Sequence, residues 1–210
     1  MKIYEFGNRE SDIVLLQPVL GSDTTPTEKE IAMIRENTGM DFSLAAFRVN
    51  DWNTDLSPWE APAVFGKDGF GGKAAETLQE IENYCKDNTK TYYIGGYSLA
   101  GLFSLWAAYQ SELFKGAAAA SPSVWFPDFT EYMETHTIKT ESVYLSLGDK
   151  EEIVKNPVMA TVGDRIRAAH ELLTKQNINC ILEWNEGNHF KDAPQRSAKA
   201  FAWLLKQDDL

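Results

Sequence analysis

Short apolar segments recur along this chain, and a helical pattern separates most of them. They lie at residues 12–19, 42–49, 91–96, 116–121, 142–148 and 179–185. The segments are apolar throughout rather than alternating with polar residues, which is typical of parallel strands covered on both faces of a sheet. Strands that alternate with helices predict an α/β fold of three α-β-α layers around a mostly parallel, doubly wound sheet.

The helical patterns occupy residues 72–87, 98–111, 163–177 and 194–207. In the first of them, Ala75, Leu78, Ile81 and Cys85 recur at helix spacing and predict its buried face. A chain of 210 residues is long enough to bury one full core. Because the sequence contains no repeat, low-complexity tract or charge block, we expect one domain over residues 1–210.

One long connection, residues 50–72, interrupts the alternation. Loops of this length in compact domains are usually either functional or disordered. This one carries the aromatic residues Trp52, Trp59, Phe65 and Phe70, which argues against disorder. We therefore predict an ordered loop over one end of the sheet, beside an active site.

Charge and composition limit the classes of partner. The net charge of −11 disfavours binding to nucleic acid and to anionic lipid surfaces. No apolar run reaches the length of about 20 residues that a membrane helix needs, and residues 1–10 lack the apolar region of a secretory signal. Cys85 and Cys180 fit neither a disulfide scaffold nor a metal site and predict free thiols in a reducing cytoplasm. The oligomeric state, with a homodimer as one option, stays open.

A lone serine surrounded by small residues marks the junction of the third strand and its helix. The sequence around it, "GYSLAG", places Ser98 between Gly96 and Ala100. A sharp strand-to-helix turn can hold one side chain clear of the sheet, and it needs small residues two positions to either side. The backbone N–H of Leu99, at the start of the helix, would then donate to a developing oxyanion. The alternative is that Ser98 is an ordinary helix N-cap.

A serine nucleophile needs a base, and the chain offers three histidines. His170 lies within a predicted helix and His136 near a helix end, so packing or solvent exposure explains both. His189 lies between the last strand and the last helix, in a loop at the carboxyl edge of the parallel sheet, where active sites form. We predict His189 as the base, the alternative being an ordinary loop histidine.

The third member of a triad is a carboxylate that orients the imidazole. It should follow the strand at residues 142–148, where the sequence reads "DKEE". Glu151 stands three residues beyond Gly148 and is favoured, with Asp149 as the alternative acid. An acidic turn exposed to solvent explains the same cluster without a catalytic role. The chain order of serine, acid and histidine matches one known arrangement of this triad.

These segments resemble the α/β-hydrolase superfamily, in particular the esterase branch that includes esterase D and the enterochelin (siderophore) esterases. The resemblance rests on "IGGYSLAG", on "GDKEE" followed by "GNHF", and on "SPSVWF" at residues 121–126. It implies the α/β-hydrolase fold and hydrolysis of carboxylic esters. Because the chain is short for this superfamily, we expect no separate cap domain. The branch takes its first oxyanion donor from a loop that often contains a His-Gly pair. This chain has Gln17 and Pro18 there, so the backbone N–H of Val19 is the candidate.

The resemblance implies that Ser98 attacks a carboxylic ester and forms an acyl-enzyme, with no metal or organic cofactor. A pocket with several aromatic residues would favour a small or aromatic soluble ester. Trp52, Trp59, Trp125 and Phe126 are candidates for the substrate pocket, and core packing explains them equally well. The fold also hosts acyltransferases, peptidases and non-catalytic interaction proteins, so these classes stay open. Cleavage of siderophore esters is one specific option that no residue establishes.

Overall fold

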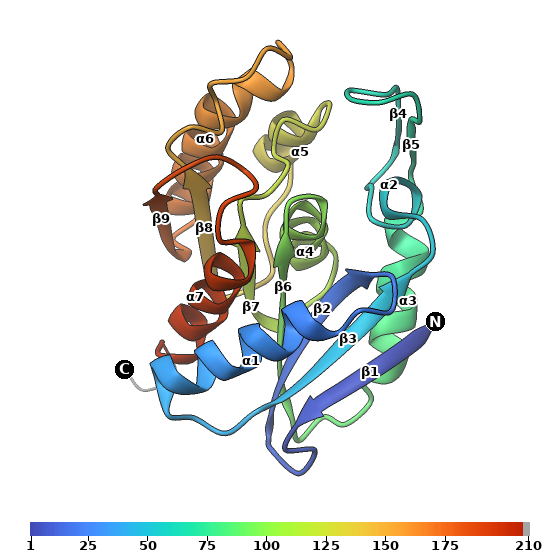
Figure 1. Ribbon diagram of the computed structural model, residues 1–210, viewed down its shortest axis with the longest axis vertical. Helices are drawn as coiled ribbons and strands as arrows, with labels where there is room; N and C mark the ends of the chain where they lie inside the picture. Colours follow the sequence, from blue (N-terminus) through green and yellow to red (C-terminus); the bar gives the residue numbers. More distant parts are fainter. Residues whose placement is uncertain (208–210) are drawn as a thin grey trace.

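A central seven-stranded sheet organises the molecule in the computed structural model, which describes residues 1–207 (Figure 1). The strand order is β1-β3-β2-β6-β7-β8-β9, and only β1 runs antiparallel, against β3. The strands are Lys2–Gly7 (β1), Ile13–Leu20 (β2), Ser43–Val49 (β3), Thr91–Tyr97 (β6), Phe114–Ala120 (β7), Ser142–Gly148 (β8) and Asn179–Asn185 (β9). The six predicted strands and the mostly parallel sheet are confirmed.

Helices cover both faces of this sheet (Figure 1). They are Thr25–Thr38 (α1), Trp52–Asp55 (α2), Ala74–Tyr84 (α3), Leu99–Gln110 (α4), Phe129–Thr135 (α5), Val162–Lys175 (α6) and Ala193–Leu205 (α7). The α1 and α7 helices pack against each other on one face, and α3, α4, α5 and α6 lie on the other. Among residues 1–207, no helix combines the length and apolar character that crossing a bilayer requires.

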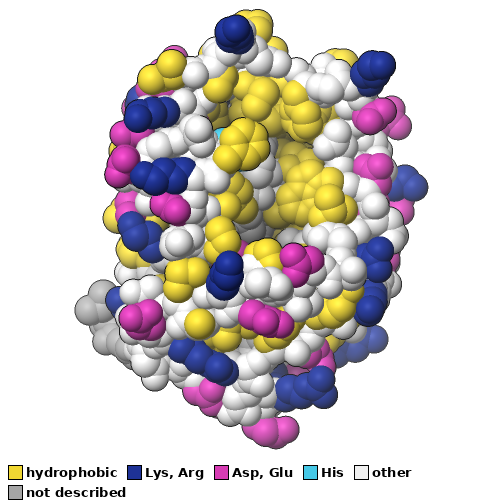
Figure 2. All heavy atoms as spheres, in the orientation of Figure 1, with side chains coloured by type: hydrophobic (Ala, Val, Ile, Leu, Met, Phe, Trp, Pro, Cys, Tyr) yellow, Lys and Arg dark blue, Asp and Glu magenta, His cyan; other side chains and the backbone are white. Residues whose placement is uncertain are grey.

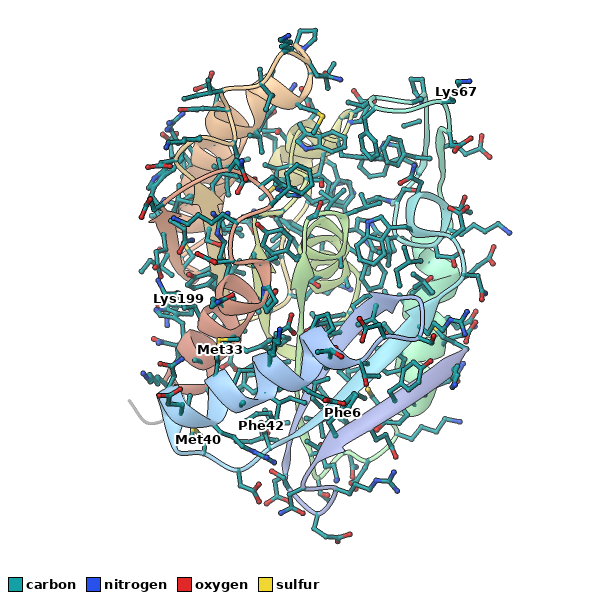
Figure 3. All side chains as sticks on the ribbon, in the orientation of Figure 1. Phe6, Met33, Met40, Phe42, Lys67 and Lys199 are labelled. Carbon is teal, nitrogen blue, oxygen red and sulfur yellow. The ribbon has the colours of Figure 1, made fainter. Side chains whose placement is uncertain are left out.

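The sheet separates two hydrophobic clusters, and successive strand residues alternate between them. In β6, Tyr92 and Ile94 join the cluster beneath α3 and α4, whereas Tyr93 joins the cluster beneath α1 and α7. The second cluster includes Phe42, with Met33 of α1 packed against it (Figure 3). The continuous apolar character of the predicted strands thus follows from burial on both faces.

Several elements were not predicted, among them β1, α1 and α5, and one helix face was predicted incorrectly. The edge strand β1 pairs only with β3, and α1 buries the polar residues Thr27 and Glu30 beside Ile31 and Ile34, so neither element shows a strong apolar pattern. In α3 the buried face begins at Ala74 and includes Thr77, whereas Ala75 is exposed. The prediction for Ala75 is wrong. Ala74, one turn before Leu78, is the alanine that faces the core. Cys85 and Cys180 are both free thiols, as predicted.

The long connection at residues 50–72 is ordered, as predicted. It contains α2 and a small hairpin of Glu60–Ala61 (β4) and Phe70–Gly71 (β5), and Lys67 lies in the loop between these two strands (Figure 3). The hydroxyl of Ser57 accepts the backbone N–H of Gly72 at 2.8 Å, which closes the connection near its base. The indole N–H of Trp59 donates to the carbonyl of Pro127 at 3.1 Å, which ties the connection to the segment after β7.

A buried polar pair lies beneath α1. Glu30 of α1 and Gln17 of β2 are both buried, and the Gln17 side chain lies close to the Glu30 carboxyl group. Burial raises the pKa of Glu30 to about 8, and the Gln17 side chain, which lowers this pKa, offsets only part of the rise. Glu30 therefore holds a proton in the folded protein at neutral pH.

Replacing Glu30 by glutamine should change how stability depends on pH. The folded-state pKa of about 8 exceeds the ordinary glutamate pKa of 4.5, so between these values the folded protein keeps a proton that the unfolded chain loses. The free energy of unfolding of the wild type therefore falls as pH rises through this window, by on the order of 4 kcal/mol. Glu30→Gln has no carboxyl group to titrate, so its stability relative to the wild type should increase from pH 5 to pH 8.

Urea unfolding at several pH values measures this difference. Glu28→Gln is the matched control, because Glu28 is an exposed residue of the same helix and should follow the wild type. A difference between Glu30→Gln and the wild type that stays constant from pH 5 to pH 8 would contradict the expectation.

Candidate active site

The turn between β6 and α4 holds Ser98 in a strained conformation. Its φ of 60° and ψ of −121° are unfavourable for a residue with a side chain. A Cβ atom on Gly96 would lie 2.6 Å from the Cβ of Ala100, so neither position accepts a larger side chain. The backbone N–H of Ser98 donates to the carbonyl of Ala120 at 3.1 Å, which fixes the turn against β7. The predicted strand-to-helix turn with small neighbours is confirmed.

The helix that follows Ser98 lies in the interior of the protein. The residues of α4 from Leu99 to Tyr109 are all buried, which explains why its sequence is apolar on every side. Ser98 occupies the N-cap position, but its hydroxyl makes no capping hydrogen bond. The serine is therefore not an ordinary N-cap. Leu99 is the first helical residue, and N–H groups in the first turn of a helix have no partner within the helix.

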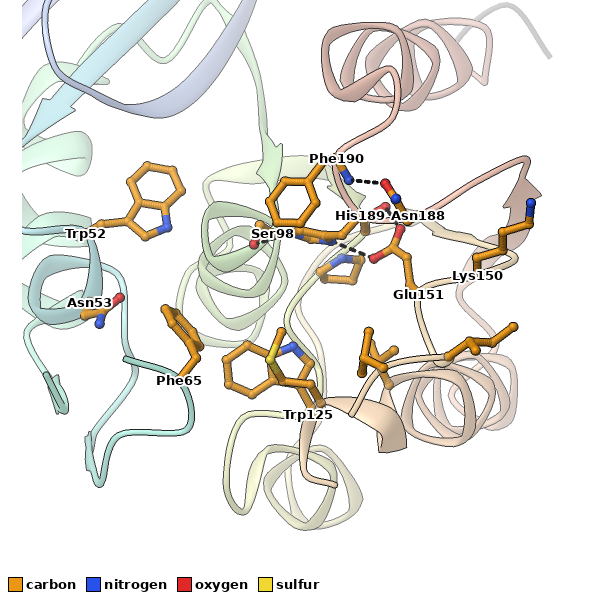
Figure 4. Close-up of a pocket in the computed structure, with 16 residues that line it drawn as sticks. Trp52, Asn53, Phe65, Ser98, Trp125, Lys150, Glu151, Asn188, His189 and Phe190 are labelled. Atoms are coloured by element: carbon orange, nitrogen blue, oxygen red, sulfur yellow. Dashed lines mark hydrogen bonds and ion pairs between the residues drawn. The ribbon is translucent and has the colours of Figure 1, made fainter. Parts of the chain in front are cut away.

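The imidazole of His189 lies between Ser98 and Glu151 (Figure 4). Its Nε2 is 2.9 Å from the Ser98 Oγ, and its Nδ1 is 2.6 Å from the Glu151 Oε2. The hydroxyl of Tyr97 donates to the His189 carbonyl at 2.9 Å and so helps to fix the loop. The structure thus brings together the three side chains that the sequence predicted as nucleophile, base and acid.

The other histidines lie elsewhere. His136 is exposed at the end of α5, where its ring stacks on Tyr132, and His170 lies within α6. Both positions agree with the non-catalytic interpretation. In the described part of the chain, no three His, Cys, Asp or Glu side chains are grouped as a metal site requires.

Glu151 is 6% exposed and uses both carboxylate oxygens. While Oε2 contacts His189, Oε1 accepts the Gly148 N–H at 2.7 Å and the Ser121 hydroxyl at 2.8 Å. Burial raises the pKa of Glu151, but the hydrogen bond and charge of His189, with the bonds from Gly148 and Ser121, outweigh it and hold the pKa below its ordinary value. Asp149 instead accepts the Gly187 N–H at 2.7 Å, so the alternative acid does not contact the histidine.

Arg196 of α7 completes this arrangement and was not predicted. It is 2% exposed, and its Nη1 lies 2.7 Å from the Glu151 Oε1. The same nitrogen donates to Tyr97 and Ser121, and Nη2 donates to the carbonyls of Glu186 and Asn188. Arg196 therefore joins the carboxylate to the loop that carries His189. Its i, i+4 spacing with Ala200 and Leu204 was the available signal, because it places the arginine on the buried face of α7.

A cavity of about 590 Å³ opens above these residues, and hydrophobic side chains surround the hollow (Figure 2). Apart from Ser98, Glu151 and His189, the lining residues are Trp52, Asn53, Phe65, Ser121, Pro122, Trp125, Lys150, Ile153, Val154, Met159, Val162, Asn188 and Phe190. They come from the connection at residues 50–72, the segment after β7, the loop after β8 with the start of α6, and the loop after β9. The predicted lining residues Trp52 and Trp125 are among them.

The prediction that Trp59 and Phe126 also line the pocket is wrong. Phe126 is 2% exposed, and its ring packs edge-on against Phe70 with the centroids 5.1 Å apart. Trp59 packs against Phe126 and Phe129, and its indole N–H donates to the backbone carbonyl of Pro127. Both rings belong to the core layer behind the cavity wall. Val19 lies near the end of β2 and packs, half-buried, against the second hydrophobic cluster, and its role as an oxyanion donor stays a prediction.

Solved structures of other proteins resemble this chain. An IroE-like serine hydrolase from Shewanella oneidensis superimposes with a TM-score of 0.75 at 15% identity, over 99% of this chain and 76% of that one. The siderophore hydrolase EstA from Aspergillus nidulans superimposes with a TM-score of 0.65 at 17% identity, over 95% of this chain and 85% of that one. The enterobactin esterase FES from Shigella flexneri superimposes with a TM-score of 0.66 at 13% identity, over 98% of this chain and 55% of that one.

No protein-family model and no curated protein sequence matches the chain. At identities between 13% and 17%, the similarity establishes the fold and not the activity. The chain has the α/β-hydrolase fold, as its sequence predicted.

Removing the cation beside Glu151 should destabilise the protein. Arg196→Met leaves a buried carboxylate without its charged partner, which costs about 3–5 kcal/mol of unfolding free energy in urea. Adding Glu151→Gln to Arg196→Met should recover part of this loss, because it removes the unpaired charge.

Arg165→Met is the control, because Arg165 pairs with Glu131 on the surface at 3.1 Å. Such exposed pairs contribute about 1 kcal/mol or less. The account is contradicted if Arg196→Met destabilises the protein no more than Arg165→Met does.

Proposed function

We propose that this protein is a serine hydrolase that cleaves carboxylic esters through an acyl-enzyme. The observation that carries the proposal is the continuous hydrogen-bonded row from the Ser98 Oγ through the His189 imidazole to the buried Glu151 carboxylate. A hydroxyl at the start of a helix, a base within 3.2 Å of it and a carboxylate behind the base are what nucleophilic acyl transfer needs. The names of the similar structures, which include hydrolases and esterases, agree with this chemistry.

In the first half of the reaction, the Oγ of Ser98 bonds to the ester carbonyl carbon while His189 takes the proton of the Ser98 hydroxyl. The carbonyl oxygen becomes an oxyanion, and the Leu99 N–H donates to it, with the Val19 N–H as the proposed second donor. His189 then gives its proton to the alcohol oxygen as the bond from carbon to that oxygen breaks. In the second half, His189 takes a proton from water as the water oxygen bonds to the acyl carbon. The bond from that carbon to the Ser98 Oγ then breaks, His189 returns the proton to this oxygen, and the carboxylic acid is released.

Glu151 stabilises the imidazolium that forms in both halves. Its Oε1 is already occupied by Gly148, Ser121 and Arg196, so the Oε2 is held in one position toward the Nδ1 of His189. This fixes the ring so that Nε2 stays directed at Ser98. The carboxylate stays ionised because the hydrogen bonds that it accepts hold its pKa down.

The lining of the cavity is suited to binding a neutral ester with a small or aromatic acyl group. Its walls include the indole rings of Trp52 and Trp125 and the phenyl ring of Phe65. Among the described residues that line it, Lys150 supplies the single cationic side chain, which is little to neutralise a polyanionic ligand such as a ferric siderophore. A transferase or a peptidase could use the same three residues. Alcoholysis faster than hydrolysis, or release of amine from aminoacyl anilides, would identify these alternatives.

A fluorophosphonate probe tests the nucleophile directly. We expect intact-mass analysis to show one phosphonyl adduct on the wild type and none on Ser98→Ala. Ser123→Ala is the matched control, because the Ser123 hydroxyl lies 3.4 Å from that of Ser98, whereas the ring of His189 is hydrogen-bonded to Ser98 and Glu151. This variant should keep the adduct. An adduct that survives Ser98→Ala would refute the assignment.

The two candidate acids should differ sharply in their effect on turnover. Glu151→Gln removes the charge that stabilises the imidazolium, and we expect kcat on a simple ester to fall by roughly 10³–10⁴-fold. Asp149→Asn keeps an oxygen that can accept the Gly187 N–H, so kcat should stay within about threefold, well below a tenfold change in rate. Equal losses in the two variants, measured on purified and folded protein, would contradict the choice of Glu151.

A further inference from the structure

Phe190 stands at the cavity with its ring almost entirely in solvent. It is 89% exposed, although it directly follows His189 and lines the same cavity as Ser98 (Figure 4). Most large apolar side chains of the described chain are buried, and exposing a phenyl ring forgoes the free energy of removing it from water. An exposed ring beside a reactive serine is well placed to be covered by a ligand.

The direction of proton transfer shows which half of an ester would reach Phe190. The Nε2 of His189 must deliver a proton to the leaving alcohol, so the alcohol half lies on the imidazole side of Ser98. The Phe190 ring is on this side, edge-on to the imidazole with the centroids 5.7 Å apart. Trp52 and Phe65 lie across from it, on the other side of Ser98 (Figure 4).

The loop that carries Glu151 adds further apolar side chains to the cavity lining. Ile153 and Val154, from the loop that carries Glu151, line the cavity and are exposed. Lys150 belongs to the same loop, but its amino group points away from Ser98 (Figure 4). Asn188 also lines the cavity beside Phe190, but its Oδ1 already accepts the Phe190 N–H at 3.0 Å. An anionic alcohol would therefore find no cation directed at it, whereas an apolar one would cover exposed rings and methyl groups.

Resting on the proposed ester hydrolysis, we propose that Phe190 determines specificity for the alcohol half, and that this half is a neutral apolar group of aromatic size. Trp52, Phe65 and Trp125, on the remaining walls, select the acyl half. The same cavity thereby separates the recognition of the two halves of the ester, with the scissile bond between them at Ser98.

Two matched ester series separate these roles. Benzyl butyrate and methyl butyrate differ only in the alcohol, and their leaving groups have similar basicity. The wild type should prefer the benzyl ester in kcat/KM, and Phe190→Ala should reduce the benzyl-to-methyl ratio by about tenfold to thirtyfold, as expected for losing one buried ring contact. The loss should appear mainly in KM, and Phe190→Leu should restore part of the ratio.

The second series varies the acyl group at constant alcohol, with methyl 3-phenylpropionate and methyl butyrate. Phe65→Ala should lower this ratio and leave the benzyl-to-methyl ratio unchanged, the reverse of Phe190→Ala. Trp184→Ala is the control, because this tryptophan is exposed on β9 and stacks under Arg167, outside the lining of the cavity. It should change neither ratio.

The inference is overturned if Phe190→Ala changes both ratios equally, or changes neither while the enzyme remains active. That outcome differs from failure of the proposed function, in which the wild type hydrolyses no ester of either series and forms no adduct with a fluorophosphonate.

Discussion

The site depends on a buried carboxylate held from two sides. Glu151 contacts His189 through one oxygen, and it meets Arg196, Ser121 and a backbone N–H through the other. A carboxylate removed from water is stable only if its charge is paired and its oxygens are hydrogen-bonded. Arg196 meets this need and also donates to the carbonyls of Glu186 and Asn188, so one side chain of α7 connects Glu151 to the loop that carries His189.

The parallel sheet explains why side chains distant in sequence meet. The carboxyl ends of neighbouring parallel strands lie along one edge, and β6, β8 and β9 end next to Ser98, Glu151 and His189. The strained turn at Ser98 persists because α4 is buried on every side and cannot shift to relieve it. Fold and site are therefore coupled, since the apolar helix that stabilises the core also presents the serine hydroxyl.

Sequence reasoning located the strands, the turn and the three side chains because each rests on local pattern and chain order. Glu151 could be chosen over Asp149 only by its spacing from Gly148, and the structure gives each a different partner. Arg196 was missed because an arginine in a helix usually faces solvent, and its acceptors come from several distant segments. Trp59 and Phe126 were misplaced because sequence alone cannot distinguish the surface of a cavity from the layer of core behind it.

The most direct test of this account is a crystal structure of the protein after reaction with a fluorophosphonate. The account predicts phosphorus bonded to the Ser98 Oγ, a phosphoryl oxygen within hydrogen-bonding distance of the Leu99 N–H, and His189 still joined to Glu151. Phosphorus on another side chain, or a phosphoryl oxygen directed away from the start of α4, would contradict it.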